Sequence, residues 1–240
     1  MIKLSVIIPS SDSPATVQKF LPGILAAIED CDTTEVILVD AWDRESKRNY
    51  VESLGVKYVF AGKARRSFQS NFGAKAATGI LLFFLHIDSK PPRGFDAIIS
   101  ASANDGFESG SFKLKFASSS RFLAAFAWFT KFKWSIARGG DQGLFVKRAV
   151  FDEVGGYKNA WQIMEDVDLA RKLIKRKTFA ILRPALVTSA RKYERVGIIK
   201  LQFLFTVITI LYWMGISNKT IYRFYLKYVE ERKDVPPVQV

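Results

Sequence analysis

The stretch that decides the fold is residues 80–88, Ile-Leu-Leu-Phe-Phe-Leu-His-Ile-Asp. Its apolar run shows no alternation, which is typical of a strand buried on both faces at the centre of a parallel sheet. We expect the strand to end in Asp88, because Pro91 and Pro92 follow and proline cannot extend a central strand. Open α/β sheets bind ligands at the carboxyl ends of such strands. Asp88 is therefore predicted to bind a divalent cation and a phosphate group; the alternative is that it caps a turn.

Working outward from this strand, apolar runs and helical patterns alternate along the chain. We expect strands at 4–9, 35–40, 56–60, 107–116 and 144–147, and helices beginning at Pro14 and near Ala149 and spanning 66–78, 95–103 and 165–175. Gly79 is placed to cap the 66–78 helix. This rhythm predicts an α/β fold with a mostly parallel central sheet, flanked by helices and connected by right-handed crossovers.

The composition indicates the class of protein but does not identify its binding partner. A chain of 240 residues with 49% hydrophobic residues fits one large folded domain. The only cysteine, Cys31, excludes an internal disulfide and points to a reducing compartment, the cytosol. The net charge of +13 favours an anionic partner. Nucleotide diphosphates, anionic lipid and nucleic acid all fit that charge, but no zinc-finger spacing or RNA-recognition signature is present.

Two segments of the chain are unusually apolar or aromatic. Residues 201–216 contain no charged side chain, yet they are shorter than the roughly 20 residues that span a bilayer. This segment is predicted to be a helix that is buried against the core or lies in a membrane interface, and both interpretations stay open. Residues 122–134 combine many aromatic side chains with lysines. Together the two segments indicate a hydrophobic or membrane-bound acceptor and peripheral contact with the inner face of the cell membrane.

The candidate chemistry rests on carboxylates. Asp40 ends a predicted strand, Asp141 lies in the glycine-flanked turn 139–143, and Glu165-Asp166 opens a helix. Mg²⁺ and Mn²⁺ use one or two such carboxylates together with substrate phosphates, and a separate carboxylate can act as a general base. The alternative for the acidic pair is simple complementarity to the helix dipole.

The sequence lacks residues or motifs that several other kinds of catalytic or cofactor site require. His86 is the only histidine, so histidine-based metal clusters and triads are excluded. We expect it to hydrogen-bond in or beside the sheet, with a ligand role as the alternative. There is no Walker-type or dinucleotide-type glycine loop.

The order of these pieces resembles a family 2 glycosyltransferase with the GT-A fold. The resemblance rests on Ser-Val-Ile-Ile-Pro at 5–9, Glu-Val-Ile-Leu-Val-Asp at 35–40, Gln-Ser-Asn-Phe-Gly-Ala at 69–74, Leu-His-Ile-Asp at 85–88 and Met-Glu-Asp-Val-Asp-Leu at 164–169. More narrowly, Gly-Asp-Gln-Gly-Leu-Phe-Val at 140–146 and Thr-Ser-Ala-Arg-Lys-Tyr-Glu-Arg at 188–195 are similar to a small bacterial branch of single-domain members. The resemblance implies a GT-A catalytic domain over 1–195, followed by a C-terminal helical extension over 196–240 that packs on the domain or on a membrane interface.

The resemblance also implies a role for each matching residue. Asp166 would deprotonate the acceptor hydroxyl, with Glu165 beside it, and Asp88 would bind Mg²⁺ or Mn²⁺. The remaining residues implied in binding the nucleotide, its diphosphate or the acceptor are Pro9, Asp40, Arg66, Gln69, Asn71, Asp141 and Arg191.

Two departures from the family pattern bear on these roles. His86 stands where many members carry the first aspartate of the metal motif, and the second-strand motif continues as Asp40-Ala-Trp-Asp43-Arg instead of with another Asp and Gly-Ser. The leading hypothesis is an inverting glycosyltransferase that moves a sugar from a nucleotide-diphosphate donor to an acceptor hydroxyl. The alternatives are a non-catalytic nucleotide-sugar or membrane-surface binding protein with a degenerate metal site and, on charge alone, a nucleic-acid-binding protein, which we do not expect.

Overall fold

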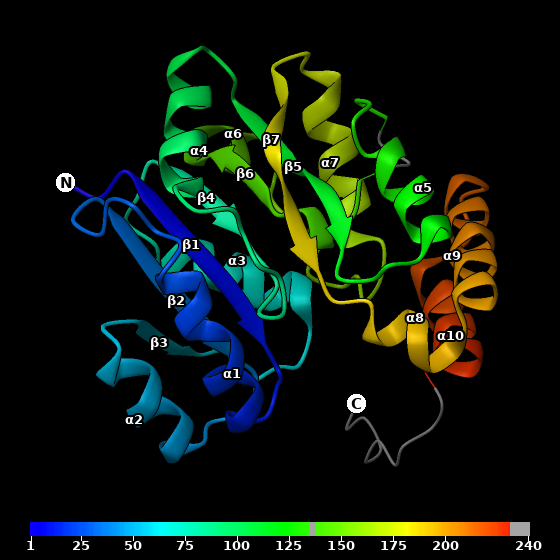
Figure 1. The fold of residues 1–240 in the computed structure, drawn as a ribbon, viewed down its shortest axis with the longest axis horizontal. Helices are drawn as coiled ribbons and strands as arrows, with labels where there is room; N and C mark the ends of the chain where they lie inside the picture. The colour runs from blue at the N-terminus through cyan, green and yellow to red at the C-terminus, as the bar shows by residue number, and fades with distance from the viewer. Residues whose placement is uncertain (135–137, 231–240) are drawn as a thin grey trace.

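The computed structural model describes residues 1–134 and 138–230, which form one twisted sheet covered by helices (Figure 1). The strands are β1 (Leu4–Ser10), β2 (Thr34–Asp40), β3 (Lys57–Phe60), β4 (Leu81–Phe84), β5 (Ser109–Phe116), β6 (Leu144–Lys147) and β7 (Phe179–Thr188). The helices are α1 (Pro14–Leu25), α2 (Glu45–Ser53), α3 (Arg66–Ala76), α4 (Phe95–Asn104), α5 (Arg121–Phe129), α6 (Arg148–Glu153), α7 (Glu165–Lys175), α8 (Arg191–Val196), α9 (Ile198–Trp213) and α10 (Asn218–Tyr228), with a short 3₁₀ turn, η2 (Gly140–Gln142).

The sheet has the strand order β3-β2-β1-β4-β6-β5-β7. β1 pairs in parallel with β2 and β4, β2 with β3, and β5 with β7. Only β6 runs antiparallel to its neighbours β4 and β5. The predicted α/β architecture with a mostly parallel sheet is therefore confirmed.

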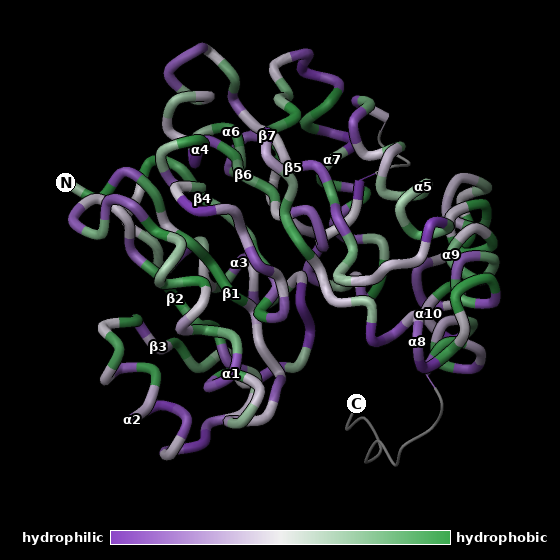
Figure 2. The backbone as a smooth tube through the Cα atoms, viewed as in Figure 1, coloured by the Kyte–Doolittle hydropathy of each residue, from purple (hydrophilic) through white to green (hydrophobic). Residues whose placement is uncertain are grey.

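Helices cover both faces of the sheet because β1 buries side chains on both sides. Val6 and Ile8 belong to a core that includes residues of α1, α2 and α4. Ile7, between them, belongs to a second core with residues of α3, α6 and α7. Hydrophobic residues run along the central strands in Figure 2, as a strand buried on both faces requires.

The predicted long strand through residues 80–88 is wrong at its carboxyl end. β4 ends at Phe84, which is the last residue paired with both β1 and β6. Leu85 still donates its N–H to the Ile7 carbonyl, and the chain then turns, with Ser89 donating to the His86 carbonyl. In the same register Pro9 of β1 would be the next residue to donate to this segment, but proline has no N–H, and β6 begins only at Leu144, opposite Phe84. The ladder therefore stops on both sides of β4.

Local signals gave a correct helix start and a wrong helix end. Ser13 caps α1 by accepting a hydrogen bond from the Thr16 N–H, with Pro14 in the first turn. Gly79, in contrast, does not cap α3, which ends at Ala76 followed by extended Ala77. Gly79 is needed instead because a Cβ there would lie 2.9 Å from the Leu4 and Ser5 backbone.

The C-terminal helices pack beside the start of α7. Leu201, Leu204 and Ile208 of α9 form a separate core with Val167 of α7 and Ile221 of α10. The expected helix is thus observed, although it runs over 198–213 instead of 201–216, and one of its faces is buried against the protein. Within the described residues, no helix has the length and hydrophobicity that a membrane span requires. Residues 231–240 of the expected C-terminal extension lie outside the described residues, and the division at 195/196 stays a prediction.

Candidate functional site

The acidic pair lies at the start of α7, on a strained turn. Met164 immediately precedes the pair, with a left-handed φ of 63°, a conformation that costs a non-glycine residue free energy and is concentrated at functional sites. Glu165 is buried and Asp166 is partly exposed. The nearest cation is Arg66 at the start of α3, whose Nη1 lies 3.7 Å from Glu165 Oε1 and 4.0 Å from Asp166 Oδ2.

Burial makes this pair electrostatically unbalanced. Loss of solvent, together with the charge of Asp166, raises the pKa of Glu165 to about 7, although Arg66 acts in the opposite direction. Arg66 is half-exposed and shared between the two carboxylates. Near neutral pH, Glu165 is therefore partly protonated, which lessens its repulsion of Asp166.

A glycine brings three predicted site segments together. His86 Nδ1 lies 2.9 Å from Asp141 Oδ1, which links the turn after β4 to η2. The neighbouring Gly140 packs so closely that a Cβ there would collide with the His86 ring and with the Asp166 carboxylate. Against desolvation, which raises it, the hydrogen bond from His86 lowers the pKa of Asp141. Asp141, His86 and Asp166 are thus gathered in one place, as the glycine-flanked turn requires.

Asp88 and Arg191 face one another at the same edge. Arg191, at the start of α8, places Nη2 3.6 Å from Asp88 Oδ2, and both side chains are partly accessible to solvent. The two residues are far apart in sequence and meet because β7 delivers α8 to the turn that follows β4. The structure brings these two predicted residues together.

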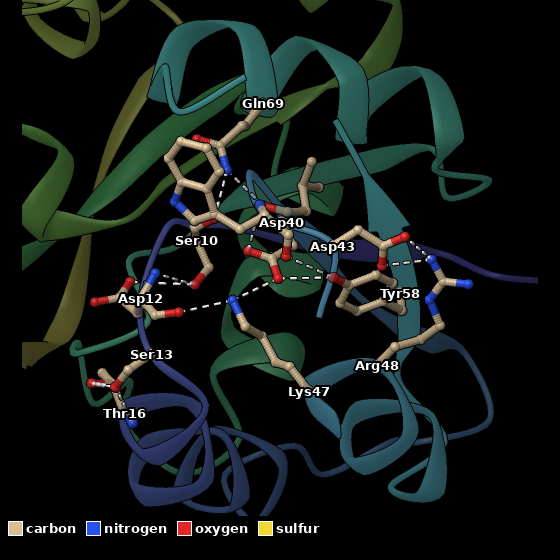
Figure 3. A network of polar contacts seen from close by, with 12 residues as sticks. Ser10, Asp12, Ser13, Thr16, Asp40, Asp43, Lys47, Arg48, Tyr58 and Gln69 are labelled. Atoms are coloured by element: carbon tan, nitrogen blue, oxygen red, sulfur yellow. Dashed lines mark hydrogen bonds and ion pairs between the residues drawn. The ribbon is translucent and has the colours of Figure 1, made fainter. Parts of the chain in front are cut away.

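Asp40 lies at the end of β2 in a closed network (Figure 3). The side chains of Asp40 and Lys47 are both fully buried, and Asp40 Oδ2 lies 2.6 Å from Lys47 Nζ. The Tyr58 hydroxyl donates to the same oxygen at 2.8 Å, and Lys47 also donates to the Asp12 carbonyl. Burial and the hydrogen bond to Asp40 raise the pKa of Tyr58, which keeps its hydroxyl protonated.

The predicted amide residues hold the framework of the site. Gln69 is buried, and its Nε2 donates to the carbonyls of Ser10 at 2.7 Å and Val39 at 2.8 Å, which ties the ends of β1 and β2 together (Figure 3). Asn71 donates to the Tyr157 carbonyl and accepts from the Tyr157 N–H. Pro9 is half-buried in β1, next to the last residue of the strand. Their implied nucleotide contacts stay predictions.

Three residues of this region were missed at the level of sequence. Tyr157 is buried, and its pKa is raised by that burial, by the charges of Asp166 and Glu165, and by the interaction of its hydroxyl with Asp166. Lys192 on α8 contacts the Tyr225 hydroxyl of α10 at 2.5 Å. The only local signal is the Gly155-Gly156 pair, whose left-handed turns set Tyr157 in place. Nothing in the sequence shows that α10 returns to α8.

A divalent cation fits the chemistry of Asp88. In the described part of the chain, no three His, Cys, Asp or Glu side chains are arranged to hold a metal ion. Mg²⁺ and Mn²⁺ do not need such a cage when substrate phosphates supply most of the oxygen ligands. Asp88 is a partly exposed carboxylate beside Arg191, so it could supply the protein ligand while the guanidinium contacts an anionic group.

Solved structures of glycosyltransferases share this fold. The structure of Staphylococcus aureus TarS 1-349 matches with a TM-score of 0.64 at 16% identity, over 85% of this chain and 66% of that one. TarS 1-349 in complex with UDP-GlcNAc matches with a TM-score of 0.64 at 15% identity, over 78% of this chain and 58% of that one. The mannosyltransferase PcManGT from Pyrobaculum calidifontis, in complex with GDP-Man and Mn²⁺, matches with a TM-score of 0.67 at 17% identity, over 98% of this chain and 66% of that one.

These similarities establish the fold and nothing finer. No protein-family model matches the chain, and neither does any curated protein sequence. The chain spans about two thirds or less of the solved proteins named above. The GT-A glycosyltransferase fold expected from the sequence resemblance is confirmed.

Proposed function

We propose that this protein is an inverting glycosyltransferase that moves a sugar from a nucleotide-diphosphate donor to an acceptor hydroxyl. The observation that carries the proposal is the Glu165-Asp166 pair, set on a strained turn opposite Arg66 in a fold shared with glycosyltransferases. A pair that served only the helix dipole would need neither the burial of Glu165 nor a buried tyrosine, Tyr157, interacting with Asp166.

In this proposal Asp166 is the general base. Asp166 takes the proton of the acceptor hydroxyl, whose oxygen attacks the anomeric carbon opposite the departing diphosphate. The buried Tyr157 interacts with the Asp166 carboxylate, and the partly protonated Glu165 limits the negative charge beside it. The two neighbours therefore set the polar surroundings in which Asp166 would act.

The diphosphate would be bound by the cations at the carboxyl edge of the sheet. Arg191 and Arg66 face carboxylates here, and Lys192 lies nearby on α8. Positive groups fixed beside a leaving group that gains charge lower the barrier to its departure. Mg²⁺ or Mn²⁺ bound at Asp88 would add further positive charge to the diphosphate. PcManGT was solved with GDP-Man and Mn²⁺, which supports such a cation.

The nucleotide is proposed to lie over β1 and β2, near Pro9, Asp40 and Asp141. Gln69 and Asn71 support this proposal indirectly, because their amides fix the strand ends and the segment before α7. Asp40 would then act with Lys47 as a neutral unit beneath the nucleotide.

We infer an acceptor at a membrane surface, reached from the cytoplasmic side. α9 supports this inference, because its outward face carries exposed apolar side chains at helical spacing, Ile199, Phe203, Ile210 and Trp213. These side chains lie opposite the face that packs against α7 and α10. A helix that is apolar all round is normally covered on every side. The protein covers one face of α9, and a membrane interface would cover the other.

A thermal-shift screen of nucleotide sugars, with and without Mn²⁺, tests the proposal. At least one UDP- or GDP-sugar should raise the melting temperature, and sugar release or transfer should then be detectable with it. Binding without any turnover would favour the non-catalytic alternative. The absence of binding to every nucleotide sugar would contradict both.

A further inference from the structure

A second pocket, lined by neither residue of the acidic pair, lies at the end of β5. It is a pocket of about 350 Å³ between the end of β5 and α5, with Lys113, Lys115, Phe116, Ala127, Trp128 and Lys131 among its lining residues. Within residues 1–134 and 138–230, no acidic side chain lines this pocket. None of the roles proposed above uses these side chains.

The pocket exists because β5 extends beyond the residues that pair with its neighbour β6. β6 pairs with β5 only at residues 109–111, whereas β7 stays paired with β5 as far as Phe116. The stretch from Lys113 to Phe116 is therefore a two-stranded ribbon with one edge free of strands. α5 lies against this ribbon, and Thr130 accepts the Leu114 N–H. The wall of the pocket is thus held by regular structure on both sides.

The charges of the pocket are uncompensated. Among the described residues, no carboxylate lies within ion-pair distance of Lys113, Lys115 or Lys131. Lys131 Nζ instead lies 3.4 Å from the centre of the Trp128 ring. Three ammonium groups beside an indole and apolar walls match a ligand that carries a phosphate and an apolar portion.

The surroundings favour a lipid over a freely dissolved anion. α5 exposes Phe122, Trp128 and Phe129, and its buried Leu123 packs with Ile198 at the start of α9. The pocket is thus bordered by aromatic side chains and is linked through this packing to the apolar outward face of α9. Aromatic and basic side chains together are typical of the membrane–water interface.

The pocket is also coupled by short contacts to the catalytic edge. Arg138 is buried, and it donates to the Ser111 hydroxyl at 2.9 Å and to the Phe132 carbonyl at 2.6 Å. It therefore fixes the segment after α5 to β5. Gly140, two residues beyond Arg138, packs on Asp166. An occupant of the pocket would be held in a fixed relation to the acidic pair.

We propose that this pocket binds the phosphate headgroup of a membrane lipid and seats the catalytic edge on an anionic membrane. This proposal extends the proposed function. It rests on that function for one point, the membrane-bound acceptor. Its test does not depend on turnover, because lipid binding and nucleotide-sugar binding are measured separately.

The test compares two triple variants of equal charge. Lys113→Gln, Lys115→Gln and Lys131→Gln are combined in one, and Lys3→Gln, Lys75→Gln and Lys175→Gln in the other. The control lysines are exposed and lie before β1, in the last turn of α3 and in the last turn of α7, at the opposite edge of the sheet. Both variants lower the net charge of the protein by the same amount. A difference in vesicle binding between them therefore reports binding at the pocket and not general electrostatic attraction.

Flotation is measured with vesicles of phosphatidylcholine alone and of phosphatidylcholine mixed with phosphatidylglycerol. The wild-type protein should bind the mixed vesicles, and the pocket variant should bind them about 10- to 100-fold more weakly, as expected for three lysines at an anionic surface. The control variant should change by about twofold or less, a distant charge being screened by salt. Equal losses in both variants, or no loss in the pocket variant, would overturn the proposal.

Two further measurements identify the occupant. Brominated phosphatidylglycerol should quench part of the tryptophan fluorescence, and Trp128→Phe should remove part of that quenching. Inorganic phosphate should not displace the protein from vesicles at matched ionic strength; complete displacement would assign the pocket to a soluble phosphate instead. Nucleotide-sugar binding without vesicles should be the same in both triple variants. Its absence in the wild type would refute the proposed function and leave the vesicle result standing.

Discussion

The two acidic sites at the carboxyl edge of the sheet differ in how far their negative charge is neutralised by neighbouring groups. At the end of β2, Asp40 is fully buried but lies 2.6 Å from a fully buried lysine and accepts a tyrosine hydroxyl. At the start of α7, two carboxylates share one half-exposed guanidinium at 3.7 and 4.0 Å. The first site is balanced within the protein, whereas the second carries excess negative charge.

This difference separates polar groups that hold the fold from groups that are available for chemistry. A buried ion pair with further hydrogen bonds is already neutralised, so removing one partner damages stability. A buried carboxyl whose pKa is shifted by burial and by a like charge is typical of an active site. The contrast predicts that changes near Asp40 act mainly on folding and that changes near Asp166 act mainly on activity.

The largest effect is expected from Asp166→Asn. Loss of the general base should lower transfer, or donor hydrolysis, by about a thousandfold. Nucleotide-sugar binding, measured by calorimetry, should stay within about twofold of the wild type on the same grounds, because the base acts on the acceptor. Asp152→Asn on α6, an exposed carboxylate outside the site, is the matched control. Unchanged activity of Asp166→Asn would remove Asp166 from the base role.

The balanced site is tested by Lys47→Ala. This change leaves the Asp40 charge buried without its partner, which should lower the free energy of unfolding by about 3–5 kcal/mol. The neighbouring exposed pair between Arg48 and Asp43, also 2.6 Å apart, is the control. Arg48→Ala should cost about 1 kcal/mol or less. Urea unfolding of both variants makes the comparison, and equal costs would contradict the structural role of Asp40 and Lys47.

The unbalanced site is tested by the pH dependence of stability. The folded protein keeps a proton on Glu165 up to about pH 7, whereas the unfolded chain releases it near 4.5. The folded state thus binds more protons between these values, so the free energy of unfolding falls as the pH rises from about 4.5 to 7.

Glu165→Gln removes this titration and should flatten that part of the profile, by on the order of 2 kcal/mol. Glu52→Gln, an exposed residue of α2, should leave the slope unchanged. Denaturant unfolding at a series of pH values gives both curves. The same slope in Glu165→Gln and the wild type would mean that another group titrates.

A smaller effect is expected at Asp88. Asp88→Asn should weaken nucleotide-sugar binding by about tenfold in the presence of Mn²⁺, because it removes the one carboxylate assigned to the cation. In EDTA the variant and the wild type should bind alike. Calorimetry under both conditions provides the measurement, and equal affinities with Mn²⁺ would exclude Asp88 as the metal ligand.

The sequence predicted the elements better than their ends and partners. The periodicity of apolar residues located the parallel strands and α7, because burial on one or both faces leaves a local pattern. The end of β4 was misplaced, since it is decided by where β1 and β6 stop pairing. The role of Gly79 was also missed, because it depends on the close approach of the β1 backbone, which no local sequence pattern indicates.

The candidate site was predicted in its carboxylates but not in its surroundings. Asp88, Asp141 and the Glu165-Asp166 pair follow turns or strand ends, where local patterns are informative. Other contacts join segments far apart in the chain. Examples are the contact between Asp88 and Arg191 and the contact between Lys192 and Tyr225. Such contacts depend on strand order and on the return of α10, which one sequence does not reveal.

The configuration of the sugar released from the donor tests the central claim most directly. If Asp166 activates a hydroxyl for direct displacement, water can replace the acceptor in slow hydrolysis. With an α-linked nucleotide sugar, proton NMR should then show the β-anomer appearing first, before mutarotation, and Asp166→Asn should abolish its formation. Initial release of the α-anomer would contradict the account, because it requires retention through a covalent or front-face route.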